Sequence, residues 1–179
     1  MIRDSLLMFT GVGTAGQSPT STGDNTSTFS YDTAPLGLPT GSGGAASTGY
    51  NAGSSVNAGR DLGLGGEMWL EVLVTAAVTA AGGAATVKFD FVTDSVAALS
   101  NVVDSTAVGV LLASPAFPKA TLALGFLYRT QLPASLVYQE FIGVDFVIAT
   151  NTLTLGTFEA KLIMNVQASD LYLSGFAVQ

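Results

Sequence analysis

Alternating apolar and polar residues are the main pattern along this chain, and a period of two predicts β-strands. The clearest runs cover residues 67–74, 85–93, 137–148 and 157–167. In the first run, the apolar side chains that share one face are Met68, Leu70, Val72 and Val74. Because successive side chains of a strand point to opposite faces, we expect such sets to form the core side of a sheet.

Shorter runs of the same kind cover residues 5–9, 26–31, 107–113 and 122–128. Turn signals separate the runs, such as Gly82-Gly83 and Ser114-Pro115. Residues 95–103 predict one turn of helix, and no other segment combines a helical period with capping residues. The chain is therefore predicted to be all-β, with seven to eight strands in an antiparallel β-sandwich of jelly-roll or immunoglobulin-like kind.

A change of composition marks residues 10–59, which are rich in Gly, Ser, Thr and Ala. Within them, residues 33–59 contain seven glycines and no charged side chain. We expect a single domain over residues 1–179, in which residues 10–59 form an extended arm or loop. Long loops without secondary structure are usually functional or disordered, so we predict that this one serves assembly. Its few large side chains are the predicted partner contacts: Leu36, Leu38, Tyr50 and Val56.

Composition narrows the possible chemistry. The 179 residues include no histidine and no cysteine, so the usual general base and the usual transition-metal ligands are missing. We expect no enzymatic activity, no cofactor and no metal. The six cations are scattered and the net charge is -7, which argues against nucleic-acid binding. Residues 72–87 are uncharged but too short and too interrupted for a transmembrane helix, so no membrane association is expected.

Several acidic residues are candidates for a site. Asp90 and Asp94 are close in sequence, but alternation places Asp90 on the solvent side of its strand, and Asp94 begins a turn. We therefore interpret both as solvated surface acids and not as a glycosidase pair. Asp24, Asp32 and Asp104 lie near Ser, Thr or Asn, but no calcium-loop spacing accompanies them.

The single tryptophan, Trp69, lies on a strand rich in Leu and Val. With Tyr31 and Tyr50 it is also a candidate for a sugar-binding platform. A tryptophan in such a strand is more often a core or interface residue, so Trp69 is our fifth predicted partner contact. Apolar side chains on nominally outer faces, such as Leu73 and Ile163, further predict that a neighbouring subunit covers part of the surface.

The order of several short segments resembles the cement, or decoration, proteins of tailed bacteriophages, of the type found on the short-tailed Bordetella phage. The likeness covers residues 1–9 and 60–167. The matching segments, given by their residues, are Asp4-Ser5-x-Leu7-x-Phe9, Arg60-Asp61-Leu62-Gly63-x-Gly65, the acid-led strand at residues 67–74, Ala80-Ala81-Gly82-Gly83-Ala84-Ala85-Thr86, Ser114-Pro115, Leu132-Pro133 and Phe158-x-Ala160-x-Leu162. This sequence departs from the family in residues 10–59, which are longer and richer in glycine, and at Gln139 and Glu140, where arginines are expected.

The resemblance implies a jelly-roll homotrimer that binds the major capsid protein on the outer surface of an icosahedral head. Such a protein is made and assembled in the cytoplasm of the bacterial host and becomes part of the virion. Its role is to stabilise the contacts between capsomers. The alternative that the residues leave open is a carbohydrate-binding β-sandwich module of a phage fibre or a bacterial surface protein.

Overall fold

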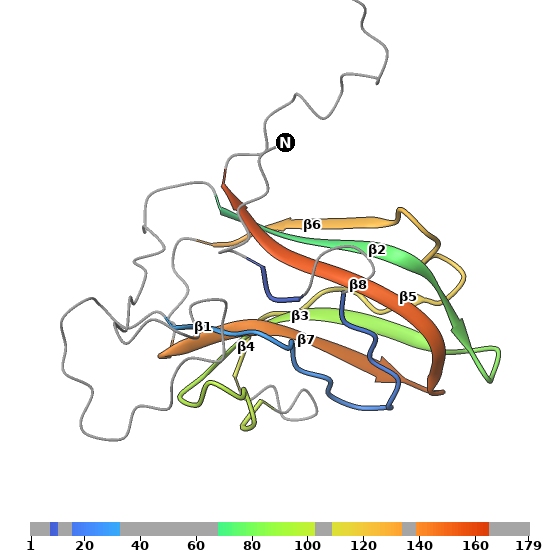
Figure 1. Ribbon diagram of the computed structural model, residues 1–179, viewed down its shortest axis with the longest axis horizontal. Helices are drawn as coiled ribbons and strands as arrows, with labels where there is room; N and C mark the ends of the chain where they lie inside the picture. The colour runs from blue at the N-terminus through green and yellow to red at the C-terminus, as the bar shows by residue number, and fades with distance from the viewer. Residues whose placement is uncertain (1–7, 11–15, 33–67, 103–108, 134–138, 165–179) are drawn as a thin grey trace, which may run out of the picture.

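The computed structural model describes residues 8–10, 16–32, 68–102, 109–133 and 139–164, and these residues form two antiparallel sheets packed face to face (Figure 1). The five-stranded sheet has the order β1-β7-β3-β4, with β5 also paired to β3, and the three-stranded sheet has the order β6-β2-β8. The strands are β1 (Tyr31–Asp32), β2 (Met68–Ala80), β3 (Thr86–Asp94), β4 (Val110–Leu112), β5 (Phe117–Pro118), β6 (Leu127–Gln131), β7 (Phe141–Ala149) and β8 (Leu153–Met164).

The predicted all-β antiparallel sandwich is confirmed. The described residues contain eight strands and no helix, and consecutive strands lie in different sheets except for β3, β4 and β5, which share the five-stranded sheet. None of the described segments is a helix long and apolar enough to cross a bilayer.

The core between the sheets consists of the apolar faces that alternation predicts. Leu70, Val72 and Val74 of β2 are at most 1% exposed, and they face the apolar side chains of β3 and β7. Phe89 lies at the centre, with its ring centroid 5.5 Å from that of Phe158. Three further rings surround it, those of Phe117, Tyr128 and Phe146. Such a cluster fixes the spacing of the two sheets by close packing.

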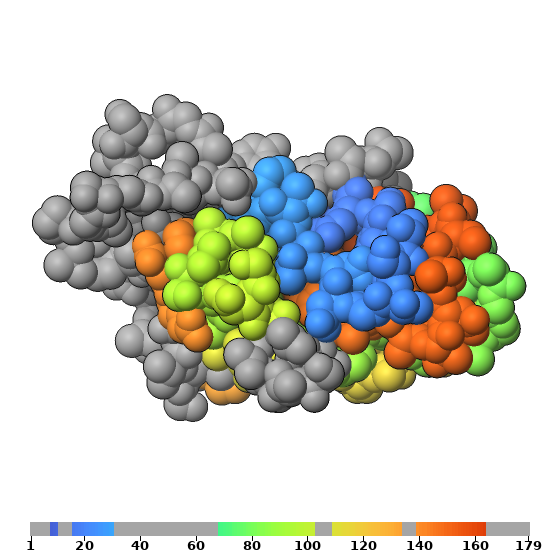
Figure 2. Space-filling view, turned by 90° about the horizontal axis from the view of Figure 1, so that it is seen from below, coloured from blue at the N-terminus to red at the C-terminus, as the bar shows by residue number. Residues whose placement is uncertain are grey.

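The N-terminal part of the chain covers the strand edges on one side of the sandwich. Met8 and Gln17 pair with β8, and Gly23 and Thr26 pair with β7, each through an isolated bridge. Figure 2 shows this segment, in blue, lying beside β8 and beside the loop at residues 95–102. An unpaired edge exposes backbone groups that invite pairing with other chains, so this segment protects both sheets along that side.

Several local predictions differ from the structure. The strand expected at residues 26–31 is reduced to an isolated bridge at Thr26 and to Tyr31, where β1 begins. The strand expected at residues 122–128 begins later, as β6, because residues 118–126 form consecutive turns that end at Gly125, where φ is 86°. Residues 95–102 form two tight turns, with bonds from Leu99 N–H to the Val96 carbonyl and from Val102 N–H to the Leu99 carbonyl, and not the expected turn of helix. The short strand β5 was not predicted.

Candidate functional site

Buried charges lie on the outer face of the three-stranded sheet, the face turned away from the core. The register places Glu71 of β2 between Arg129 of β6 and Lys161 of β8. Arg129 Nε lies 2.6 Å from Glu71 Oε2, and Lys161 Nζ lies 2.7 Å from Glu71 Oε1. Lys161 Nζ is also 3.6 Å from Oε1 of Glu159. Two acids therefore meet two cations on this outer surface of the three-stranded sheet. We call this surface the ion-pair face.

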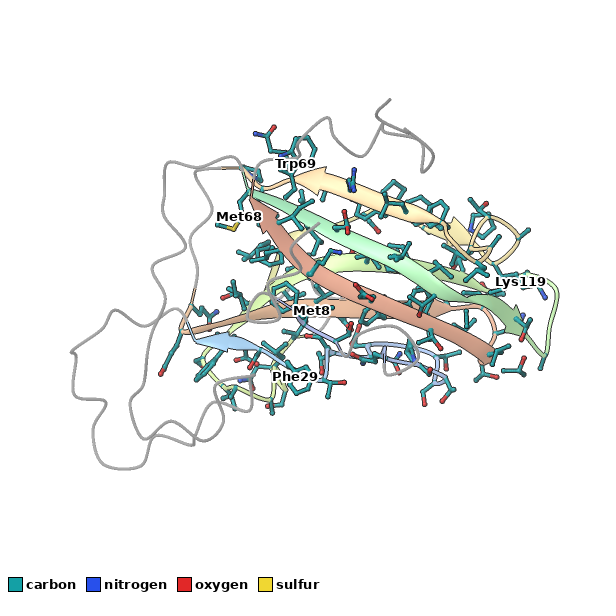
Figure 3. All side chains as sticks on the ribbon, turned by 45° about the horizontal axis from the view of Figure 1, so that its top comes forward. Met8, Phe29, Met68, Trp69 and Lys119 are labelled. Atoms are coloured by element: carbon teal, nitrogen blue, oxygen red, sulfur yellow. The ribbon has the colours of Figure 1, made fainter. Side chains whose placement is uncertain are left out.

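Apolar side chains flank this ion-pair face. Trp69 is opposite Gln131 and Ile163 in the register, and Leu73 is opposite Leu127. Figure 3 shows Trp69 at one end of the sandwich and Lys119 at the other. Trp69 is half-buried, and its Nε1 is buried with no hydrogen-bond partner in the described structure.

The outer face of the five-stranded sheet carries acids in excess, and we call it the acidic face. Asp90 of β3 and Asp145 of β7 are directly opposite one another in the register, and both side chains are fully buried. Lys88 and Ser114 both contact Asp90. Lys88 Nζ is 3.0 Å from its Oδ2, and the Ser114 N–H donates to its Oδ1 over 3.0 Å.

Asp145 has a different environment. The Asn25 N–H donates to its Oδ1 over 2.7 Å, while its Oδ2 is buried without a donor, and the side chain contacts the carboxyl of Asp24. Burial first, and then the negative charge of Asp24, raise the pKa of Asp145 from 3.8 to about 7, with a further contribution from Asp90. A carboxyl in such a place keeps its proton in mildly acidic solution, and its hydroxyl is then able to donate to Asp24.

Asp94 shows the opposite behaviour at the end of β3. Burial raises its pKa, but hydrogen bonds from Asn101, Val96 and Ser95 outweigh burial, so the pKa lies below 3.8. The Asn101 N–H and side-chain amide each donate to Asp94 over 2.8 Å. Asp94 thereby fixes the loop at residues 95–102, whose Leu99 packs in a small apolar cluster with Val92 and Phe141.

The prediction that Asp90 and Asp94 are solvated surface acids is wrong. Both side chains are at most 2% exposed. Alternation correctly placed Asp90 away from the core, but it does not tell what covers the outer face, and here the segments around Ser114 and Asn25 cover it. A usable signal was present in β7, where Asp145 stands within an otherwise apolar run, because strands buried on both faces have this pattern.

Among the five predicted contact residues, the structure describes only Trp69. Leu36, Leu38, Tyr50 and Val56 lie outside the described residues. Sequence reasoning missed the exposed apolar side chains, of which Leu124 is 70% exposed and Leu155 is 56% exposed. Within the described ranges, no group of three or more acidic, His or Cys residues is arranged to hold a metal ion.

Together these features define a two-sheet β-sandwich with buried charges on both outer faces. Residues 43–162, about two thirds of the chain, match the family model described as Bbp16. The chain therefore belongs to the Bbp16 family. The family name points to a Bordetella phage protein, and we accordingly treat the chain as phage-related. No curated protein matches it.

Proposed function

We propose that this protein is a capsid cement protein that binds the outer surface of an icosahedral phage head and stabilises the contacts between capsomers. Membership of the Bbp16 family carries this proposal, because the family name indicates a phage protein. The partners are the major capsid protein and further copies of this chain, in a homotrimer. The protein is made in the host cytoplasm and becomes part of the virion.

The architecture suits such a role. Cementing requires a rigid body and complementary surfaces, and no bond-making chemistry. The core is closely packed, and the segment at residues 16–30 covers the strand edges on one side. In a trimer, three weak contacts reinforce one another, because after the first contact forms the others are effectively intramolecular. The net charge of -7 also disfavours adhesion to DNA.

The described surface offers contacts for a partner. Leu124 lies in the turn before β6, where the Gly125 N–H donates to the Val74 carbonyl over 2.9 Å. This bond fixes the backbone beneath an apolar side chain that is 70% exposed. A fixed, exposed leucine loses little conformational entropy on binding, which favours it as a contact with the capsid.

No observation favours the carbohydrate-binding alternative. A sugar platform needs accessible aromatic faces and polar groups beside them. Trp69 is half-buried and its Nε1 is inaccessible to a sugar hydroxyl, while the side chains of Tyr31 and Tyr50 are outside the described part of the structure.

The direct test uses phage heads that lack this protein, prepared from a phage in which its gene is deleted. Adding the purified protein should give saturable binding, in multiples of three copies per site, and should raise the temperature at which the heads release DNA. Leu124→Ser should weaken binding, whereas Ala123→Ser, at the neighbouring exposed position, should not. The absence of the protein from intact virions, together with binding to glycans, would overturn the proposal.

A further inference from the structure

Residues 23–27 attach to the edge of β7 through a short series of hydrogen bonds. Gly23 and Ile148 exchange two backbone bonds, of 2.8 and 3.0 Å. Further along, the Ser27 N–H donates to the Val144 carbonyl over 2.6 Å. Between these bonds, the Phe146 N–H donates to the Asn25 carbonyl over 3.1 Å, and the Asn25 N–H donates to the side chain of Asp145 and not to the backbone of β7. A carboxyl group is therefore one of the groups that hold the centre of the attachment.

That carboxyl group faces other acids from both sides. Asp24, on the attached segment, contacts the Asp145 side chain, and Asp90 faces it from β3. Lys88 is the nearby cation, and its Nζ is bound to Asp90. Within the described residues, no cation lies at ion-pair distance from Asp145, and Asp145 Oδ2 is buried without a donor.

The surroundings of the three carboxyl groups decide which of them is charged and which keeps its proton. Two carboxylates in contact do not both ionise readily, and the one with fewer donors and less solvent keeps its proton. Lys88 and the Ser114 N–H stabilise a charge on Asp90, and solvent stabilises one on the exposed Asp24. Asp145 is left as the group that holds the proton, with Asp24 as its hydrogen-bond acceptor.

We propose that Asp24 and Asp145 form a proton-dependent latch that holds residues 23–27 on the edge of β7 and weakens when Asp145 ionises. With the proton present, one hydrogen bond joins the two side chains. Without it, two negative charges face each other across the attachment while Asp90 adds a third. The segment then detaches more readily, because only a short series of hydrogen bonds at a sheet edge, those of Gly23, Asn25 and Ser27, still holds it.

The sign of the effect follows from the two protonation states. The pKa of Asp145 is about 7 when the segment is attached, and detachment moves it toward the ordinary value of 3.8, because Asp24 leaves with the segment. In this range the attached form binds a proton that the detached form has lost, so attachment weakens as the pH rises. From pH 5.5 to pH 8.5, detachment should become more favourable, by at most about thirtyfold.

Hydrogen exchange of the full-length protein, read by NMR at individual amides, tests the latch. We expect the protection of the Gly23 and Ser27 amides, corrected for the intrinsic effect of pH, to fall between pH 5.5 and pH 8.5, by at most about thirtyfold. Amides that pair β2 with β8 serve as the internal reference and should keep their protection.

Two variants separate the latch from a general effect of pH. Asp24→Asn changes an exposed residue, so the fold should persist, and it should reduce the pH-dependent fall. Asp145→Asn should abolish the fall, because an amide does not ionise. Its oxygen still accepts from the Asn25 N–H, so the segment should remain attached. Glu140→Gln, an acid-to-amide change just before β7, is the matched control and should retain it. Equal protection at both pH values in the natural protein, or an unchanged fall in Asp24→Asn, would overturn the proposal.

Discussion

The two outer faces of this sandwich bury charged side chains to a similar degree but balance them differently. On the ion-pair face, Glu71 and Glu159 meet Arg129 and Lys161. On the acidic face, the described residues place one cation, Lys88, beside three acids, Asp24, Asp90 and Asp145. The difference shows that burial alone does not define the role of a charged residue. The first face holds its charges by pairing, whereas on the second Asp145, which has no cation at ion-pair distance among the described residues, holds a proton.

The largest expected effect comes from breaking the ion-pair face. Lys161→Met removes a base from between Glu71 and Glu159 and leaves two buried carboxylates with less compensation. We expect the free energy of unfolding to fall by about 3–5 kcal/mol, as measured by urea denaturation at pH 7.

Arg129→Met is the matched control on the same face. Its side chain is 23% exposed, and Glu71 keeps its contact with Lys161 when Arg129 is removed. The loss should therefore be smaller. An equal or larger loss for Arg129→Met would contradict the view that Lys161 is the centre of the ion-pair face.

The second prediction sharpens the contrast, because an acid-to-amide change on the acidic face should stabilise the protein. Between pH 3.8 and about 7, folded Asp145 keeps a proton that the unfolded chain has lost, so the free energy of unfolding falls as the pH rises through this window. Asn does not ionise. Asp145→Asn should therefore exceed the natural protein in stability at pH 8 by up to about 4 kcal/mol.

This gain must depend on pH. In urea denaturation at a series of pH values, the gain in the free energy of unfolding should shrink as the pH falls from about 7. It should disappear near pH 4, where both folded and unfolded Asp145 approach the protonated state. A constant difference at all pH values would indicate a packing effect and not the removal of a proton site.

The third prediction changes the acidic face without changing its charge. A Cβ at Gly143 would collide with the side chain of Leu99 and would lie 2.8 Å from Ser27 Oγ. Gly143→Ala should therefore cost about 1–3 kcal/mol by overpacking, with little dependence on pH in thermal denaturation. Gly83→Ala, where nothing lies within 4 Å of the added Cβ, should change stability far less.

The sequence predicted which side chains face the core better than it predicted which side chains are buried on the outer faces of the sheets. Alternation found the core side of β2, because Leu70, Val72 and Val74 face one common layer that any sandwich must contain. It placed Asp90 on the outer face but did not predict its burial, because the groups that bury this face come from elsewhere in the chain, such as the Ser114 N–H. Contacts of this kind depend on the path of loops, which a period of two does not encode.

The candidate site was less predictable for the same reason. From the sequence, Asp24 was considered only as a possible calcium ligand, and Asp145 was not considered at all. The contact between them joins residues 121 positions apart, and it exists only because residues 23–27 pair with the edge of β7. The acid within the apolar run of β7 was the one local sign that this strand is covered on both faces.

The most direct test of the contrast between the two faces is the titration of Asp145 itself. The carbon-13 chemical shift of its carboxyl group should be followed by NMR from pH 3 to pH 9, in the natural protein and in Asp24→Asn. We predict a midpoint near 7 in the natural protein and a lower midpoint in the variant, because the charge of Asp24 is gone. A midpoint near 4 in the natural protein would show that Asp145 carries a charge at neutral pH, and would contradict the account of the acidic face.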